Sequence, residues 1–202
     1  MSEFWEESFK EKQEMWGFEP SKSTVITNEI FLKNGIKDIL VLGIGYGRNA
    51  QLFITNKMKV TGIEISETAI SLAHKHLGNG IIIHHGSITE MPYDDETYDG
   101  IYCYAVLHFL DYDERQKLLQ DCYNQLENNG KMVFATISKS AEMYGRGRVV
   151  STNRFEIFDG LKMFFYDLDT IQKEFALFGL IEIKEVDDIF PFFLIQCQKV
   201  KM

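Results

Sequence analysis

The chain has few residues of several types, and each shortage excludes a class of protein. It has only three cysteines, Cys103, Cys122 and Cys197, which stand far apart among apolar residues. This odd number and spacing exclude a disulfide framework and indicate reduced thiols in the core. No window holds the roughly 18 uninterrupted apolar residues of a membrane span, and the N-terminus lacks a basic start followed by an apolar run. We therefore expect a cytoplasmic protein without a membrane partner.

Basic residues are in the minority, with 21 Lys and Arg against 30 Asp and Glu and a net charge of -9. Binding to nucleic acid needs clustered basic residues, so nucleic acid is not an expected partner. A metal site is not expected either. His74 and His76, like His84 and His85, fall on different faces of a helix or strand, and no cysteine cluster joins them.

What the chain does have is enough apolar sequence for one domain, with 45% hydrophobic residues among 202. Apolar runs alternate with helical patterns, which is typical of a mostly parallel sheet covered on both faces. The expected parallel strands are 36–43, 58–65, 80–85, 98–106 and 131–137. Between them we expect a helix from Ser66 to Gly78, and another that begins at Asp113 and ends before Asn129 and Gly130.

The alternation of apolar runs and helical patterns ends after the fifth expected strand. Residues 138–166 predict an irregular segment, and residues 167–179 predict a helix. Two more extended runs, 180–188 and 190–200, are so close in the chain that they can only be antiparallel neighbours. We therefore predict a seven-stranded sheet in which a terminal hairpin inserts its last strand antiparallel.

The segment ILVLGIGYGRNA, residues 39–50, places three glycines at alternate positions directly after the first expected strand. In an open α/β sheet, ligands bind beyond the carboxyl ends of the strands. Gly43, Gly45 and Gly47 would let a ligand lie against bare backbone, close to the amides that start the next helix. An ordinary turn from strand to helix needs one such glycine, so the alternation favours a binding loop.

Glu64 stands at the end of the second expected strand, 21 residues after Gly43. A carboxylate at this place can accept hydrogen bonds from both hydroxyls of a ribose; a solvated surface acid is the alternative. The dinucleotide pattern G-x-G-x-x-G needs a third glycine where this chain has Arg48. The spacing therefore favours an adenosine with a short charged tail over a nicotinamide dinucleotide.

From about Ile36 to Met202 the chain resembles the class I S-adenosylmethionine-dependent methyltransferases. The resemblance is carried by the ordered motifs VLGIGYGRNA, GIEIS, HGSITEMPYDDETYDGIYCYAVLHFL and LENNGKMVFATIS. The N-terminal WEESFKEKQEMWGFEPS is similar to the lead-in of small-molecule members, including tellurite-resistance and thiopurine enzymes. The resemblance implies one three-layer αβα Rossmann-like domain over 1–202, with a helical lid at 1–34 and an acceptor-side insertion at 138–166.

The resemblance also implies a cofactor and a role for each matching residue. The loop 43–47 would lie beneath the methionine moiety of S-adenosyl-L-methionine, and Glu64 would bind its ribose. Ser87 would meet the adenine edge, although that position is commonly Asp in the family. The implied cofactor-binding residues are Gly43, Ile44, Gly45, Tyr46, Gly47, Asn49, Glu64, Ile65, Ser87, Ile88, Tyr104 and Ala105.

The implied reaction is in-line transfer of a methyl group to a small-molecule acceptor, with S-adenosyl-L-homocysteine as the leaving group. Tyr104 and His108 are the candidate catalytic residues. His108 would act as a general base, with a structural hydrogen bond at a helix end as the alternative. Three basic residues could hold an anionic acceptor or be solvated loop charges, namely Arg146, Arg148 and Arg154.

Two other functions stay open, a nicotinamide-dependent oxidoreductase and a non-catalytic module that binds S-adenosylmethionine. The sequence contains no signal for the acceptor's identity or for the oligomeric state. Aromatic residues that could form the lid and the acceptor wall, or simply belong to the core, are Trp5, Phe9, Trp16, Tyr144, Tyr166, Phe192 and Phe193.

Overall fold

The structure is a computed structural model that describes residues 2–158 and 160–200. The ends of the expected domain, Met1 and 201–202, and Asp159 of the expected insertion lie outside the described residues. The helices are α1 (Ser2–Lys12), α2 (Lys22–Lys33), α3 (Ala50–Thr55), α4 (Glu67–Leu77), α5 (Tyr112–Gln125) and α6 (Leu168–Phe175), with short 3-10 turns η1 (Ile88–Glu90), η2 (Leu107–Phe109) and η3 (Ala176–Phe178). The strands are β1 (Asp38–Leu42), β2 (Lys59–Glu64), β3 (Ile82–His85), β4 (Tyr98–Tyr104), β5 (Leu126–Ile137), β6 (Arg148–Ser151), β7 (Arg154–Phe158), β8 (Leu161–Phe164), β9 (Leu180–Asp187) and β10 (Pro191–Gln198).

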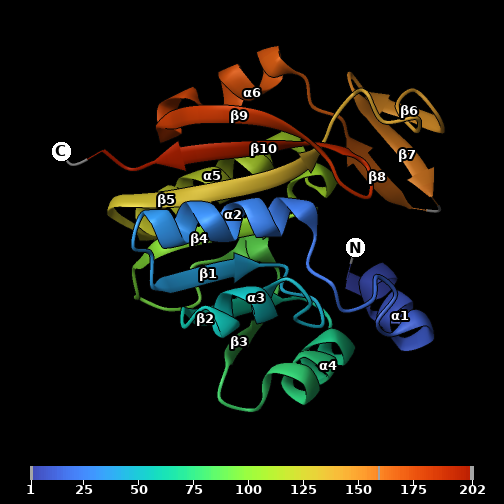
Figure 1. Cartoon of the computed structure of the whole chain (residues 1–202). Helices are drawn as coiled ribbons and strands as arrows, with labels where there is room; N and C mark the ends of the chain where they lie inside the picture. The colour runs from blue at the N-terminus through green and yellow to red at the C-terminus, as the bar shows by residue number, and fades with distance from the viewer. Residues whose placement is uncertain (1, 159, 201–202) are drawn as a thin grey trace.

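Seven of the strands form one sheet in the order β3-β2-β1-β4-β5-β10-β9 (Figure 1). The pairs from β3 to β5 are parallel, whereas β10 is antiparallel to both β5 and β9. The hairpin of β9 and β10 therefore inserts the last strand between β5 and β9. The predicted sheet, with five parallel strands and a terminal antiparallel hairpin, is confirmed.

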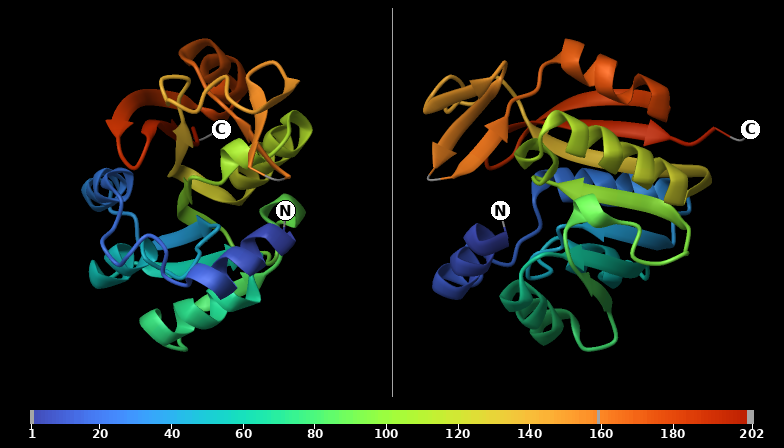
Figure 2. Two further views of the ribbon diagram at one scale, coloured as in Figure 1. Left: turned by 90° about the vertical axis from the view of Figure 1, so that its right-hand side faces the viewer. Right: turned by 180° about the vertical axis from the view of Figure 1, so that it is seen from behind.

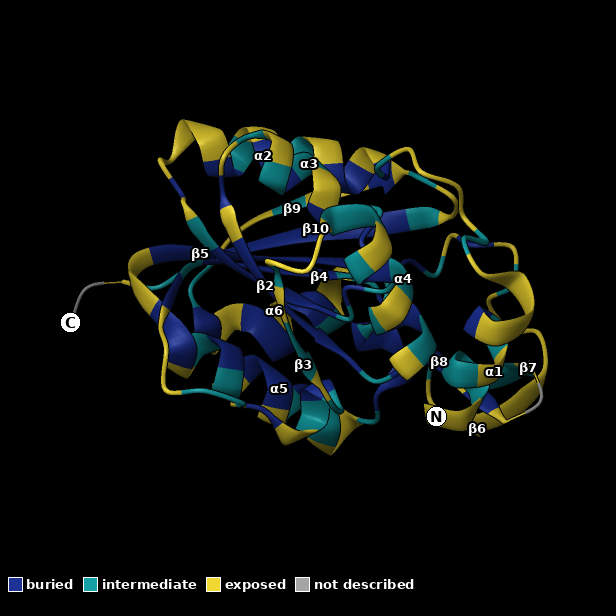
Figure 3. Cartoon of the chain, turned by 90° about the horizontal axis from the view of Figure 1, so that it is seen from below, coloured by how far each residue is buried: buried dark blue, intermediate teal, exposed yellow. Residues whose placement is uncertain are grey.

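Apolar side chains cover both faces of this sheet and make it the middle layer of three. Alternate residues of β1 point to opposite faces, so Leu40 packs in one apolar cluster and Val41 in the other. The cluster around Leu40 includes Leu118 of α5 and Phe175 of α6, whereas α2 and α3 cover the other face. Figure 3 shows α2 and α3 on one side of the buried strands and α5 on the other.

The helix boundaries follow local capping chemistry. Ser66 caps α4 as expected, because its hydroxyl accepts a hydrogen bond from the Ala69 N–H, and Gly78 ends the helix. The predicted bounds of the next helix are wrong. Asp111, not Asp113, is the N-cap of α5, in a capping box with Glu114. That helix ends at Gln125, before the predicted stop at Asn129 and Gly130, because Leu126 already pairs with β4.

The prediction of an irregular segment at 138–166 is also wrong in part. Residues 148–164 form a small antiparallel sheet of β6, β7 and β8. All four residues of β6 are exposed and most of β7 is half-buried, so neither strand has the apolar alternation that marks a strand in a sequence. In β8, Leu161 and Met163 are buried.

Both α1 and the small sheet lie at the end of the molecule toward which β1 points (Figure 1). Seen from that end, in the left view of Figure 2, they lie on opposite sides of the sheet's carboxyl edge. This is the edge at which an open α/β sheet binds its ligands. Within residues 2–158 and 160–200, no helix has the length and apolar character needed to cross a membrane.

Candidate active site

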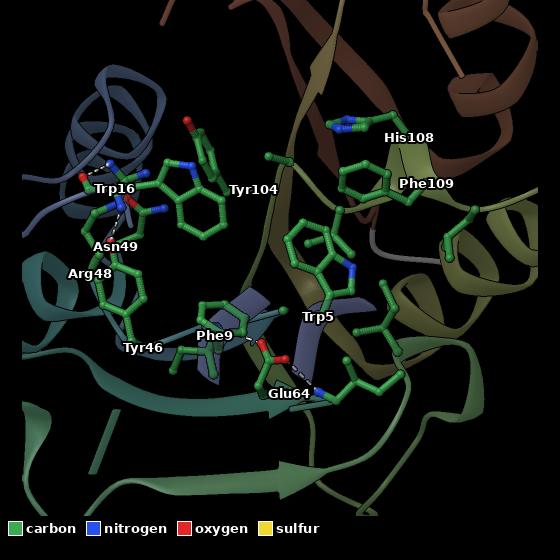
Figure 4. Close-up of a pocket in the computed structure, with 18 of the residues that line it drawn as sticks. Trp5, Phe9, Trp16, Tyr46, Arg48, Asn49, Glu64, Tyr104, His108 and Phe109 are labelled. Atoms are coloured by element: carbon green, nitrogen blue, oxygen red, sulfur yellow. Dashed lines mark hydrogen bonds between the residues drawn. The ribbon is translucent and has the colours of Figure 1, made fainter. Parts of the chain in front are cut away.

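A pocket opens at the carboxyl ends of β1, β2 and β4, between α1 and the loops that follow these strands (Figure 4). It brings together eleven of the twelve expected cofactor-binding residues and also His108; of that set, Gly47 alone does not line it. The expected residues in its wall are Gly43, Ile44, Gly45, Tyr46, Asn49, Glu64, Ile65, Ser87, Ile88, Tyr104, Ala105 and His108.

The three glycines of the first loop all have left-handed backbone, with φ of 63°, 58° and 88° at Gly43, Gly45 and Gly47. L-residues avoid this region, so each position favours glycine on conformation alone. A Cβ on Gly43 would come within 2.5 Å of Val106, and one on Gly47 within 2.6 Å of Leu77. These two glycines therefore also permit close packing inside the protein. Gly45 differs, because its Cβ would project toward the pocket and meet only Phe9, at 3.7 Å.

Glu64 ends β2 with a side chain that is only 5% exposed. Its carboxylate accepts hydrogen bonds from the N–H groups of Gly45 (2.8 Å), Ile65 (2.8 Å) and Ser66 (3.0 Å). Burial raises the pKa of Glu64, and these three donors oppose the rise. A carboxylate has about four lone-pair positions, so one is left to accept a further bond from the pocket. The glycine loop and the acid are thereby fixed to each other.

The same loop also holds the connection between α1 and α2. Tyr46 donates its hydroxyl proton to the Gly17 carbonyl (2.7 Å) and accepts from the Trp16 N–H (3.1 Å). Arg48 donates to the carbonyls of Trp16 and Glu19, at 3.4 and 3.3 Å. Asn49, just before α3, accepts from the N–H of Ser21 at 3.0 Å. Side chains of the loop after β1 therefore fix the connection between α1 and α2, which contributes Trp16 to the pocket wall.

Helix α1 covers the pocket with aromatic side chains. Phe9 is buried over Gly45, and Trp5 packs edge-on against Phe109, with ring centroids 5.3 Å apart. The helix is fastened by Glu6, which accepts hydrogen bonds from the hydroxyls of Ser66 (2.7 Å) and Thr68 (2.6 Å) at the start of α4. Together with the Thr68 N–H, these bonds lower the pKa of Glu6 to about 2.

Ser87 and Ile88 lie at the end of β3, where η1 begins. The Ser87 hydroxyl accepts the Thr89 N–H at 3.3 Å and lies 2.8 Å from the Thr89 hydroxyl. The Ser87 carbonyl accepts a hydrogen bond from Tyr93 at 2.8 Å. The hydroxyl and the carbonyl of Ser87 thus have partners in the protein, whereas Ile88 is a buried apolar residue.

The segment after β4 turns sharply away from the sheet. Ala105 has a left-handed φ of 58°, which is uncommon for a residue with a Cβ and places local strain beside the pocket. Tyr104 places its ring in the pocket wall, and burial raises its pKa to about 12, so its hydroxyl stays protonated. Burial lowers the pKa of His108 to about 3.

Several wall residues were not predicted. Arg48 was identified from the sequence only as the residue that stands where the dinucleotide pattern has its third glycine. In the structure, Arg48 lines the pocket and its guanidinium carbon lies 5.8 Å from the centroid of the Tyr104 ring. Its place directly after Gly47 in a binding loop is the signal that could have identified it. Other unpredicted wall residues come from η2, β5, β8 and the tip of the last hairpin, namely Phe109, Leu110, Ile137, Met163, Ile189 and Phe190.

The arginines proposed for an anionic acceptor do not line the pocket. Arg148 pairs with Glu156 on the small sheet, and Arg154 donates to the Phe109 carbonyl at 3.2 Å. Of the seven aromatic candidates, Trp5, Phe9, Trp16 and Phe192 are in the pocket wall. Tyr166 and Phe193 are core residues. No group of three His, Cys, Asp or Glu side chains in 2–158 and 160–200 is arranged to hold a metal ion.

The fold is shared with solved S-adenosylmethionine-dependent methyltransferases. Residues 40–134, slightly less than half of the chain, match the family model described as a methyltransferase domain. The resemblance inferred from the motifs is therefore confirmed. The narrower similarity to tellurite-resistance and thiopurine enzymes stays a prediction.

One relative is the ubiquinone biosynthesis O-methyltransferase of Pseudomonas savastanoi pv. phaseolicola, which is 27% identical over 115 residues, covering 54% of this chain and 47% of that protein. The corresponding enzyme of Coxiella burnetii is 26% identical over 128 residues, covering 62% of this chain and 53% of that protein. The chain thus spans about half the length of the curated relatives it matches.

Among solved structures, the Burkholderia thailandensis 1,6-didemethyltoxoflavin-N1-methyltransferase has a TM-score of 0.78 at 14% identity, covering 99% of this chain and 87% of that one. That crystal contains 1,6-didemethyltoxoflavin and S-adenosylhomocysteine. The CcbJ methyltransferase of Streptomyces caelestis gives a TM-score of 0.77 at 14% identity, with 98% of each chain covered. At this identity, these similarities establish the fold.

Proposed function

We propose that the protein transfers a methyl group from S-adenosyl-L-methionine to a small-molecule acceptor and releases S-adenosyl-L-homocysteine. The observation that carries this proposal is that the pocket wall combines two unlike kinds of residue. We assign the backbone and polar groups around Gly45, Glu64 and Asn49 to a polar half. We assign apolar and aromatic residues, Phe109, Met163 and Phe192 among them, to an apolar half.

The polar half suits the cofactor. One ribose hydroxyl would donate to the free position of Glu64, which is already oriented by three backbone bonds. The adenine would lie between Ile65 and Ile88. Arg48 is the only Lys or Arg among the wall residues in the described part of the chain, so we assign to it the cofactor's carboxylate.

The apolar half suits the acceptor. Met163 comes from β8, which supports the assignment of 138–166 as an acceptor-side insertion. Helix α1 and the segment to residue 34 act as the lid in this proposal, since Trp5, Phe9 and Trp16 cover the pocket from outside the sheet. Water excluded by this lid would no longer compete with the acceptor for the methyl group. The protein's main contribution is to align the acceptor atom, the methyl carbon and the sulfur.

We place this reaction in the cytoplasm. The support is the state of the three cysteines, all of which are free and buried. Burial raises the pKa of Cys103 and of Cys197 to about 12, so both are protonated and unreactive core thiols.

The proposal is tested by thermal shift with four ligands: S-adenosylmethionine, S-adenosylhomocysteine, NAD and NADP. A ligand that binds only the folded state raises the melting temperature, so the first two are expected to stabilise the protein and the last two are not. Stabilisation confined to NAD or NADP would contradict the proposal and favour an oxidoreductase. Saturable binding of S-adenosylmethionine without turnover across a panel of phenol, amine and thiol acceptors would favour a non-catalytic module.

The variant Gly45→Val tests whether S-adenosylhomocysteine binds at the glycine loop. A branched side chain there would occupy the pocket between Glu64 and Phe9, so the thermal shift with S-adenosylhomocysteine should disappear. Gly35→Val is the matched control, because Gly35 also has positive φ, at 70°, and open space around its Cβ position. Each variant is expected to lose about 1–2 kcal/mol of folding free energy. Equal shifts in both variants would contradict the placement.

A further inference from the structure

The imidazole of His108 lies beside the end of β5, just beyond the point where the neighbouring strand β4 ends. Ala105, the first residue after β4, donates its N–H to the Ala135 carbonyl of β5 and then turns away. Residues two apart in a strand present their polar groups to the same side, so the Ile137 N–H faces the edge where β4 has ended. That N–H donates to Nδ1 of His108 at 3.3 Å. Nδ1 of His108 thus accepts the hydrogen bond that a carbonyl of β4 would accept if that strand continued.

This hydrogen bond determines which ring nitrogen carries the proton. A backbone N–H can only donate, so Nδ1 of His108 has to accept and is unprotonated. The Thr136 hydroxyl lies 3.3 Å from the same nitrogen and can donate to it as well. His108 is 2% exposed, and its low pKa keeps the ring neutral through the physiological range. A neutral imidazole with a bare Nδ1 carries its one proton on Nε2.

The Nε2–H group has no partner among the described residues, and His108 lines the pocket. In Figure 4 the ring extends from its backbone toward the side of the pocket on which Tyr104 lies. Its neighbours are apolar rings, with centroids of Phe109 at 4.4 Å and Phe192 at 6.0 Å. A lone donor in an aromatic wall selects a flat ligand that brings one hydrogen-bond acceptor to that spot.

We propose that His108 is a hydrogen-bond donor, through Nε2–H, to the ionised hydroxyl oxygen of an aromatic methyl acceptor. This assignment rests on the proposed methyl transfer and replaces the general base expected from the sequence. A base at Nε2 would need a free lone pair there, and the hydrogen bonds of Nδ1 leave Nε2 with a proton instead. A neutral imidazole that donates to a substrate oxygen is a known way to stabilise negative charge.

The reaction balances without a protein base. The phenolic proton leaves to water before binding, and the Nε2–H bond then stabilises the phenolate oxygen in the apolar half of the pocket. A second lone pair of that oxygen attacks the methyl carbon, so a C–O bond forms. The S–C bond breaks with its electron pair on sulfur. The negative charge of the phenolate and the positive charge of the sulfonium both disappear. His108 is the neutral Nε2–H tautomer before and after the step.

The tautomer is tested directly by NMR on the free protein. A long-range correlation between ring protons and nitrogens of ¹⁵N-labelled histidine distinguishes a protonated Nε2 from a protonated Nδ1, and the spectrum of His108→Gln assigns the signals. We expect a protonated Nε2 and a bare Nδ1, unchanged from about pH 5 to pH 8. A protonated Nδ1, or a titration of the ring within this range, would overturn the proposal.

The donor role is tested with 4-nitrocatechol, whose visible absorption reports its ionisation. Calorimetry in the presence of S-adenosylhomocysteine would compare the wild type with His108→Gln and His108→Leu. The Gln amide nitrogen reaches about as far as Nε2 and can donate, but it is no base. We expect Leu to weaken phenolate binding at least tenfold and Gln by less than about threefold. A Gln variant as weak as Leu, a Leu variant equal to the wild type, or a wild type that does not bind the probe would each contradict the proposal.

These outcomes are separable from a failure of the proposed function. Titration of S-adenosylhomocysteine alone tests the cofactor site, whereas the NMR measurement uses the free protein and needs no ligand. A protein that binds no S-adenosylhomocysteine but shows the expected tautomer would refute methyl transfer and leave the chemistry of the ring intact. Melting temperatures of both variants check that each remains folded.

Discussion

At the scale of single residues, Glu64 shows how a binding group is prepared before its ligand arrives. Its carboxylate is buried and receives three backbone N–H bonds, so its position is fixed by the loop that it serves. Glu64→Gln would turn an NH₂ group toward one of these N–H donors. We expect a loss of about 2 kcal/mol in the free energy of unfolding, measured with denaturant, and at least tenfold weaker binding of S-adenosylhomocysteine. Glu67→Gln, at an exposed side chain nearby, is the control and should change neither.

The sequence was sufficient to predict that Glu64, Gly43 and Gly45 lie together at one pocket, because strand ends in a parallel sheet meet at one edge. It did not predict Phe109, Ile189 or Phe190. These residues reach the pocket only because η2 and the hairpin tip converge on it in three dimensions. Nor did it predict that Gly43 and Gly47 also make room for Val106 and Leu77, since no pattern in the sequence relates these pairs.

At the scale of elements, α1 is docked through Glu6, and its docking should depend on pH. Because docking lowers the pKa of Glu6 to about 2 from an ordinary 4.5, its contribution is complete above about pH 4.5 and is lost as pH falls toward 2. Glu6→Gln should mimic this loss at neutral pH. Hydrogen exchange of the α1 amides is expected to speed up in this variant. Glu7→Gln, an exposed neighbour on the same helix, should leave the exchange unchanged.

Elements were most predictable where their side chains are buried. The Ser66 cap and the buried strands of the large sheet carry strong local signals. The small sheet does not, because β6 is wholly exposed and its pairing with β7 is interrupted by a register shift. The start of α5 was misplaced by one residue, since both Asp111 and Asp113 are acceptable caps and the capping box with Glu114 selects Asp111.

At the scale of the whole molecule, a buried ion pair joins α5 to α6. Both of its residues are far from the glycine loop in the sequence. Arg115 binds both carboxylate oxygens of Glu174, at 2.7 and 3.0 Å, with side chains 3% and 5% exposed. Glu174→Ala would leave this guanidinium buried without its partner, and we expect a loss of about 3–5 kcal/mol in unfolding free energy. The double variant Arg115→Met with Glu174→Leu should recover most of that stability. A double variant less stable than Glu174→Ala would contradict this explanation.

The central claim is that the bend after β1 and the acid ending β2 together hold S-adenosylmethionine. A crystal structure with S-adenosylhomocysteine tests it most directly. We predict a ribose hydroxyl on the Glu64 carboxylate, the amino-acid end over Gly45 near Arg48, and the sulfur facing the apolar half beside His108. A ligand bound elsewhere, or a loop still filled by Phe9 with the ligand excluded, would contradict the account.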